Sequence, residues 1–128
     1  MGPNTALTTW IENMTPSMLN LMAVAASATD ALSAGTPAMR SSADQIRATV
    51  AEGRRRFDAD RGPDVEFGTR LERVLERFEF MARSLEADPE EFGGGYLPAV
   101  AHQLRLLIVD LTKFIADLER AMRSPGAR

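Results

Sequence analysis

The sequence predicts an all-α fold, an antiparallel four-helix bundle formed by a single domain. Proline-containing breaks divide the 128 residues at 35–37, 58–63 and 88–98, and apolar residues recur at helical spacing between these breaks. No segment alternates β-branched and polar residues as a strand does. A long helical hairpin completed by a second chain is the competing arrangement. The expected helices cover about 16–34, 37–57, 64–87 and 98–123, after a short amphipathic extension at about 5–14.

The first helix is expected to begin at Thr15-Pro16, because threonine caps helices well and proline fits a first helical turn. Gly35 can adopt the left-handed conformation that ends many helices, so this helix should stop just before it. Upstream of Thr15, the apolar spacing indicates a separate short helix that would depend on docking for its stability. Its apolar residues are Leu7, Trp10, Ile11 and Met14.

Heptad spacing marks the second and third helices. The second should be capped by Thr36 and begin with Pro37, whereas the third should be capped by Asp64. Gly53 favours close contact between helix backbones, with fraying of the helix as the alternative. The seam of the second helix comprises Met39, Ala43, Ile46, Val50, Gly53 and Phe57. The seam of the third comprises Phe67, Leu71, Val74, Phe78, Met81 and Leu85.

The fourth helix is apolar over the widest arc. We expect it to start near Pro98 and to be the central helix of the bundle, touching two or three neighbours. Its heptad row comprises Leu97, Ala101, Leu104, Ile108, Leu111, Ile115, Leu118 and Met122. A second, adjacent row comprises Val100, Leu107 and Phe114.

Composition excludes several classes of chemistry. The chain has no cysteine and one histidine, so it cannot form a disulfide, a thiolate metal site or a histidine-rich metal centre, and we expect no cofactor or metal. A net charge of −3 creates no long-range field that would attract nucleic acid or anionic lipid. The most apolar run, residues 18–28, is too short to span a bilayer, and no basic residue precedes Arg40 as a secretory signal requires. We therefore expect a cytoplasmic protein, and its preference for arginine over lysine is bacterial-like.

A polar cluster supports one alternative function, that of a hydrolase or small-molecule binder with an interhelical pocket. Its members are His102 and the loop acids Asp88, Glu90 and Glu91. His102 has no carboxylate one helical turn away that could orient the imidazole for proton transfer. The acidic loop also lacks the spacing of a calcium-binding loop. These observations favour structural or solvated roles for the four residues.

A second alternative is contact with nucleic acid through the consecutive residues Arg54, Arg55 and Arg56. They lie near the predicted end of the second helix, where the helix dipole stabilises cations. Acidic residues flank them on both sides and oppose binding of phosphate. The pattern is therefore more typical of a solvated helix face.

The N-terminal third is poor in charge, because residues 1–39 contain only Glu12 and Asp30 as charged residues. We expect the apolar side chains of such a segment to pack against another surface, either on the chain's own bundle or on another chain. Methionine and tryptophan are typical of adaptable and energetically dominant contacts. The predicted partner-binding residues are Trp10, Ile11, Met14, Met18, Leu21 and Met22, with residues 1–15 as a possible docking arm.

Two short stretches carry a resemblance to a known family. Leu85-Glu86-Ala87-Asp88-Pro89-Glu90, followed by Tyr96-Leu97-Pro98 at the start of an apolar helix, resembles the bromochloroindolyl-phosphate hydrolysis (XpaC-like) family. The resemblance covers at most residues 71–118. It implies a helical companion of toxic-anion-resistance proteins, and it transfers no hydrolytic residues to this chain.

The leading hypothesis is a non-enzymatic helical interaction protein. It would act as an adaptor, an accessory subunit or a homo-oligomer, and it would bind a protein partner through the apolar N-terminal segment. The three heptad-patterned helices and the charge-poor N-terminal third are the observations behind this hypothesis.

Overall fold

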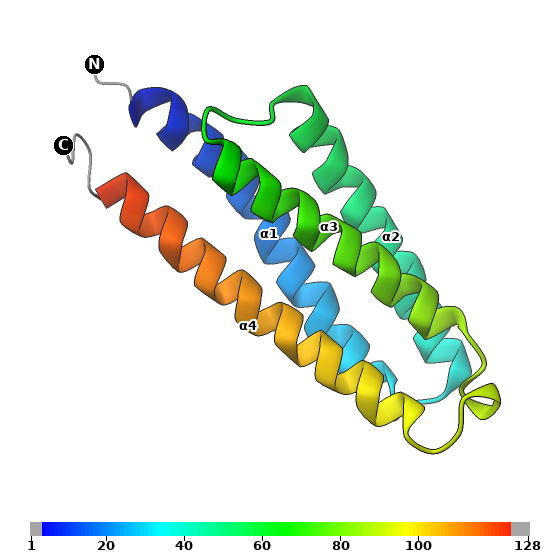
Figure 1. Ribbon diagram of the computed structural model, residues 1–128. Helices are drawn as coiled ribbons and strands as arrows, with labels where there is room; N and C mark the ends of the chain where they lie inside the picture. Colours follow the sequence, from blue (N-terminus) through cyan, green and yellow to red (C-terminus); the bar gives the residue numbers. More distant parts are fainter. Residues whose placement is uncertain (1–3, 124–128) are drawn as a thin grey trace.

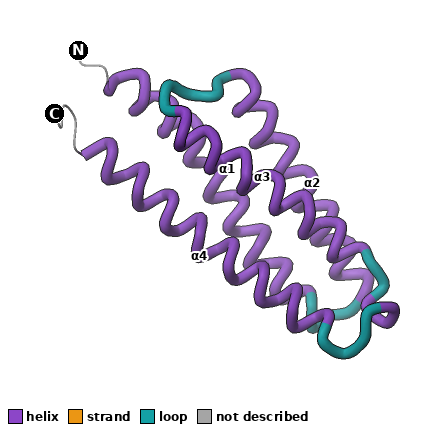
Figure 2. Tube along the Cα trace, viewed as in Figure 1, coloured by secondary structure: helices purple, strands orange, loops and turns teal. Residues whose placement is uncertain are grey.

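Four long helices form an up-and-down antiparallel bundle in the computed structural model, which describes residues 4–123 (Figure 1). The described residues contain no strand, and the loops lie at the two ends of the bundle (Figure 2). The predicted all-α bundle is therefore confirmed. Its elements are α1 (Asn4–Ala31), α2 (Thr36–Ala59), α3 (Val65–Glu86), the short 3₁₀ helix η1 (Pro89–Glu91) and α4 (Tyr96–Arg123).

Helix α1 runs without interruption through Pro16, so the predicted separation into an extension and a first helix is wrong. The Thr15 hydroxyl does not cap a new helix; it donates a hydrogen bond to the carbonyl of Ile11, one turn earlier, at 2.7 Å. Pro16 cannot donate to the carbonyl of Glu12, which weakens the helix locally. Burial of apolar side chains on both sides of the proline stabilises the continuous helix against this loss.

The other helix starts agree with the predictions in part. The Asp64 side chain accepts a hydrogen bond from the backbone N–H of Phe67 at 2.9 Å, so its predicted role as the cap of α3 is confirmed. Thr36 is instead the first residue of α2, and the residue before it, Gly35, occupies the cap position with φ of 106° and no side-chain hydrogen bond. Helix α4 starts at Tyr96, two residues before Pro98, which fits within the first turn.

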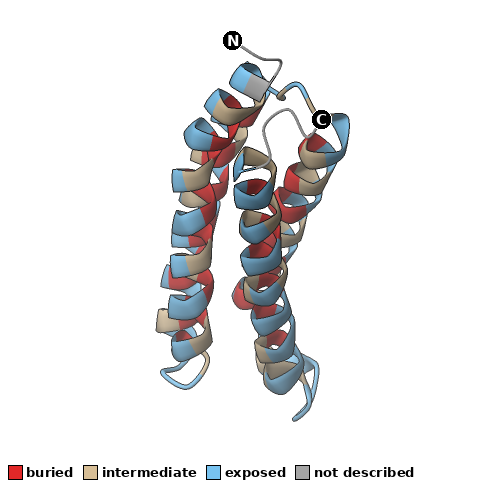
Figure 3. Ribbon diagram, turned by 90° about the vertical axis from the view of Figure 1, so that its left-hand side faces the viewer, coloured by how far each residue is buried: buried red, intermediate tan, exposed pale blue. Residues whose placement is uncertain are grey.

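The buried residues lie on the inward faces of the helices (Figure 3). All six predicted seam residues of α2 are buried, and those of α3 are buried except for the half-buried Phe67. In α4 the buried row combines members of both predicted rows, because the helix faces two neighbours at once. That row is Val100, Leu104, Leu107, Leu111, Phe114 and Leu118.

Each helix packs mainly against two others, so α4 is not more central than the rest. Helix α1 packs against α2 and α4, and α3 packs against the same two helices. The contact between α3 and α4 is the least extensive of the four. Within residues 4–123, no helix combines the length and the apolar character needed to cross a membrane.

Candidate functional site

The predicted partner-binding residues of the N-terminal segment lie in the core of the chain's own bundle. The sequence left open whether the segment docks on its own bundle or on another chain, and the structure places it on its own. A partner could reach these side chains only if α1 left the bundle, so they form no free surface in this fold. Trp10, Ile11, Met14, Met18 and Leu21 are buried, and Met22 is half-buried.

Trp10 fastens α1 to the loop between α2 and α3. Its indole Nε1 donates a hydrogen bond to the carbonyl of Asp60 at 2.8 Å, and only 1% of the residue is exposed. Its ring lies against Gly62, where an added Cβ atom would come within 2.7 Å of a ring carbon. Residues 1–15 are therefore not a separate arm: from Asn4 onward they belong to α1, while residues 1–3 lie outside the described residues.

The three consecutive arginines of α2 are all paired with carboxylates. Arg54 contacts Glu79 of α3 with 3.5 Å between Nε and Oε2, while Arg55 and Arg56 both pair with Glu52. A phosphate would have to compete with these carboxylates for the guanidinium groups. The arrangement is that of a solvated ion-pair network and does not favour nucleic-acid binding.

The residues of the predicted polar cluster do not form a site. His102 is exposed on α4, and no ion pair joins it to a carboxylate in the described part of the chain. Asp88 accepts a hydrogen bond from the backbone N–H of Glu90 at 3.0 Å and so caps η1, whereas Glu90 and Glu91 are exposed. Among residues 4–123, no group of three or more acidic, histidine or cysteine residues could hold a metal ion.

The surface between α3 and α4 contains a feature that the sequence analysis missed. Two adjoining cavities of about 360 and 200 Å³, which share Arg73 and Arg77, lie along this pair of helices; together we call them the α3–α4 groove. The first is also lined by Glu76, Phe80, Met81, Gln103 and Leu107. The second is also lined by Arg70, Val74, Asp110, Lys113 and Phe114.

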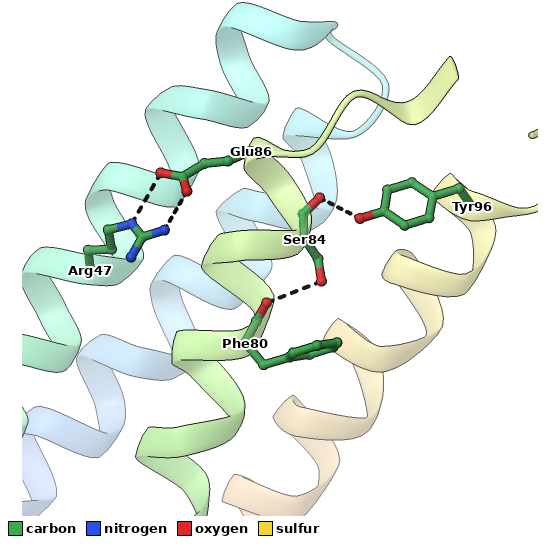
Figure 4. Close-up of polar contacts among 5 residues, drawn as sticks. All are labelled: Arg47, Phe80, Ser84, Glu86 and Tyr96. Atoms are coloured by element: carbon green, nitrogen blue, oxygen red, sulfur yellow. Dashed lines mark hydrogen bonds and ion pairs between the residues drawn. The ribbon is translucent and has the colours of Figure 1, made fainter. Parts of the chain in front are cut away.

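Phe80 is the most conspicuous side chain of the groove, because 56% of this large aromatic residue is exposed. Its ring points from α3 toward α4 (Figure 4). The sequence contained one signal for it: Phe80 lies two residues after Phe78, outside the heptad seam of the third helix. An apolar aromatic residue that breaks the register of an otherwise regular seam is a candidate for a contact outside the core.

Ion pairs and aromatic contacts hold the two walls of the groove together. Arg70 pairs with Asp117 at 2.9 Å, and Arg77 pairs with Asp110 at 2.6 Å. The guanidinium of Arg70 also lies 4.5 Å from the centre of the Phe114 ring. These long side chains reach across from α3 to α4, and they join the helices without bringing the backbones close.

The loop end of the groove is fastened by Tyr96, the first residue of α4. Its hydroxyl donates a hydrogen bond to the carbonyl of Ser84 at 2.8 Å, and the Ser84 hydroxyl donates to the carbonyl of Phe80 at 3.1 Å (Figure 4). The ring of Phe92 stacks on Tyr96 with 4.6 Å between ring centres. These contacts tie the start of α4 to the last turns of α3, next to Phe80.

A separate ion pair joins α3 to α2 on the other side of the helix. The Arg47 guanidinium makes two hydrogen bonds to the Glu86 carboxylate, one of them 3.1 Å between Nε and Oε2 (Figure 4). Hydrogen bonding to Arg47 lowers the pKa of Glu86 and raises the pKa of Arg47. Glu86 is thus engaged with α2 and is not part of the groove.

The charges that line the groove do not balance. Four cations, at Arg70, Arg73, Arg77 and Lys113, line it with two carboxylates, at Glu76 and Asp110, and a third carboxylate, Asp117, pairs with Arg70. Neither Arg73 nor Lys113 has an ion-pair partner among the described residues. The groove is therefore locally positive on a chain whose net charge is −3.

No family model, curated protein or solved structure matches this chain. The stretches that resemble the XpaC-like family lie at the end of α3, in η1 and at the start of α4. That resemblance stays a prediction, and what the groove can bind follows from its own geometry and charge.

Proposed function

We propose that this protein is a non-enzymatic helical interaction protein of the cytoplasm, an adaptor or accessory subunit that binds a partner protein through the α3–α4 groove. The class of function is the one that the sequence favours. The surface differs, because the apolar N-terminal segment lies in the core. The resemblance to the XpaC-like family implies the same kind of role, since its members look like helical companions of other proteins.

The exposed ring of Phe80 is the observation that carries this proposal. It borders a cavity of about 360 Å³ whose lining also includes the buried side chains of Met81 and Leu107. Large aromatic side chains and arginines are enriched where protein interfaces bind most strongly. The groove combines both types of residue on an accessible surface, since Phe80 and Arg73 are exposed.

Site-specific crosslinking can test the proposal in cells. A photoreactive phenylalanine analogue in place of Phe80 should capture a specific protein, whereas the same analogue in place of Leu19 should not. Leu19 is the matched control because it is a similarly exposed apolar residue, at 52%, on α1. The captured protein is then purified and titrated against the unlabelled chain.

In that titration, Phe80→Ala should weaken binding by about tenfold or more, as expected for an aromatic residue at the centre of an interface. Leu19→Ala should leave binding unchanged. The proposal fails if both positions crosslink the same products equally, or if the purified protein binds Phe80→Ala as well as it binds the native chain.

A further inference from the structure

The two halves of the α3–α4 groove, one for each cavity, share Arg73 and Arg77 but differ in their other lining residues. Phe80, Met81 and Leu107 line only the first cavity, and Lys113 lines only the second. Arg73 and Phe80 are seven residues apart on the same helix, which corresponds to about 10 Å along its axis. A ligand that contacts Phe80 and the two exposed cations Arg73 and Lys113 at once would present an apolar group and an anionic group about two helical turns apart.

The cations of the second half are free to bind such an anionic group. Arg73 and Lys113 are both exposed, and neither is engaged in an ion pair in the described part of the chain. By contrast, the other two cations of the groove, Arg70 and Arg77, are already paired with Asp117 and Asp110. The free positive charge is thus concentrated at one position along the groove.

We infer that the partner binds the groove with an acidic amphipathic helix, which places apolar side chains over Phe80 and Leu107 and a carboxylate between Arg73 and Lys113. This inference rests on the proposed function, since it specifies the partner of the same groove. It commits to a protein partner whose contacting helix is negatively charged.

A helix suits the shape of the groove. Helices α3 and α4 are antiparallel neighbours with the least extensive of the four main helix contacts, and the two cavities follow one another along the pair. An amphipathic helix can lie in such a depression and insert side chains at intervals of three, four and seven residues. Residues seven positions apart share one helix face at about the 10 Å separation of the two halves.

A second copy of this chain fits the groove less well than an acidic partner does. In such a dimer each copy would contribute two unpaired lining cations, Arg73 and Lys113, but only one unpaired lining carboxylate among the described residues, Glu76, so positive charge would be in excess. Repulsion between like charges opposes that assembly, whereas a carboxylate between the same two cations is attracted.

Designed peptides of about 20 residues can test the charge and the spacing together, since alanine-rich helices of that length form in water. The probe carries leucines on two consecutive turns and glutamates on the next two turns of the same face, in either order. One control peptide has lysine in place of each glutamate, and another has alanine in place of each leucine. Binding is followed by amide chemical shifts of the full chain, and peptide helicity by circular dichroism.

The glutamate peptide should shift amides of α3 and α4 around the groove and bind at least about fivefold more tightly than the lysine peptide. The double variant Arg73→Glu, Lys113→Gln should bind the glutamate peptide about five- to tenfold more weakly than the native chain does. It should bind the lysine peptide more tightly than the glutamate peptide. Arg105→Glu is the matched control, because Arg105 is exposed on α4 but does not line the groove; it should change little.

The remaining outcomes separate the inference from the proposed function. If Phe80→Ala weakens binding of the crosslinked protein but the glutamate and lysine peptides bind equally well, the inference is overturned and the proposed function stands. If Phe80→Ala does not change binding of the crosslinked protein and no peptide changes the amide chemical shifts around the groove, both the proposed function and the inference fail. A dimer seen by sedimentation and dissociated by Phe80→Ala would make a second copy the occupant and would overturn the inference.

Discussion

The contact between α1 and α2 differs from the contact between α3 and α4 in the size of the side chains that meet. The core near α1 and α2 includes Ala25 and Ala28 of α1 and Ala43 of α2, which are all fully buried. A Cβ added at Gly53 of α2 would lie 3.7 Å from the Cβ of Ser17 on α1, an ordinary van der Waals distance, and 3.3 Å from a methyl carbon of Leu75 on α3. Between α3 and α4, by contrast, the side chains that meet are long arginines, aspartates and the ring of Phe114.

Side-chain size therefore distinguishes these two helix pairs. Small residues let two helix backbones approach, and close packing then removes the groove that would otherwise lie between them. Between α3 and α4 the contact is less extensive, arginine side chains bridge the two helices, and the depression between them stays accessible. The side that packs tightly contributes stability, whereas the side that packs loosely offers a surface for binding.

The largest expected effect is at Trp10, where α1 meets the loop that follows α2. Trp10→Ala should lower the free energy of unfolding by about 3–5 kcal/mol, because it removes a fully buried ring together with its hydrogen bond to Asp60. Leu19→Ala, at an exposed position of the same helix, should change it by less than about 0.5 kcal/mol. Urea unfolding followed by circular dichroism measures both. A loss below about 1 kcal/mol for Trp10→Ala would mean that the N-terminal part of α1 is not part of the core.

An intermediate effect is expected at Gly62, which faces the same ring. Its φ of 87° lies in the left-handed region, and a Cβ there would overlap the indole of Trp10. Gly62→Ala should therefore reduce stability by about 2–3 kcal/mol and change the tryptophan fluorescence. Gly94→Ala is the matched control, because an added Cβ meets nothing within 4 Å there and should alter stability by less than about 0.5 kcal/mol. Equal effects of the two substitutions would contradict the packing of Trp10 against this loop.

The smallest effect is expected between α3 and α4. A double-mutant cycle with Arg77→Ala and Asp110→Ala should give a coupling free energy of about 0.2–1 kcal/mol, because both side chains are more than a third exposed. The coupling should decrease further in 1 M salt, where charges are screened over about 3 Å. A coupling above about 2 kcal/mol would show that ion pairs stabilise this contact as strongly as apolar packing stabilises the other.

The regular parts of the fold were predictable because they depend on local pattern. The heptad seams of α2 and α3 and the Asp64 cap follow from periodicity and from one side chain next to its own helix start. The continuity of α1 was not predictable in this way. Thr15-Pro16 has the local features of a helix start, and only burial on both sides of the proline overrides them.

The candidate site was harder to predict, because its residues come together only across two helices. Arg73 and Phe80 of α3 meet Lys113 and Leu107 of α4 in one groove although they are far apart in the sequence. The sequence instead favours the charge-poor N-terminal segment, since the amino-acid sequence alone does not distinguish exposed from buried apolar residues. The off-register position of Phe80 was the one local sign of the groove.

The sequence by itself determined an all-α fold of four helices, the positions of most of their breaks and the absence of cysteine chemistry, because propensity, periodicity and composition are local properties. The tertiary structure decided which apolar face is covered and which stays open. Trp10 is covered because the loop after α2 packs against it, and Phe80 is exposed where α3 and α4 make a less extensive contact than the other neighbouring helices. Both outcomes depend on distances between segments that are remote in the sequence.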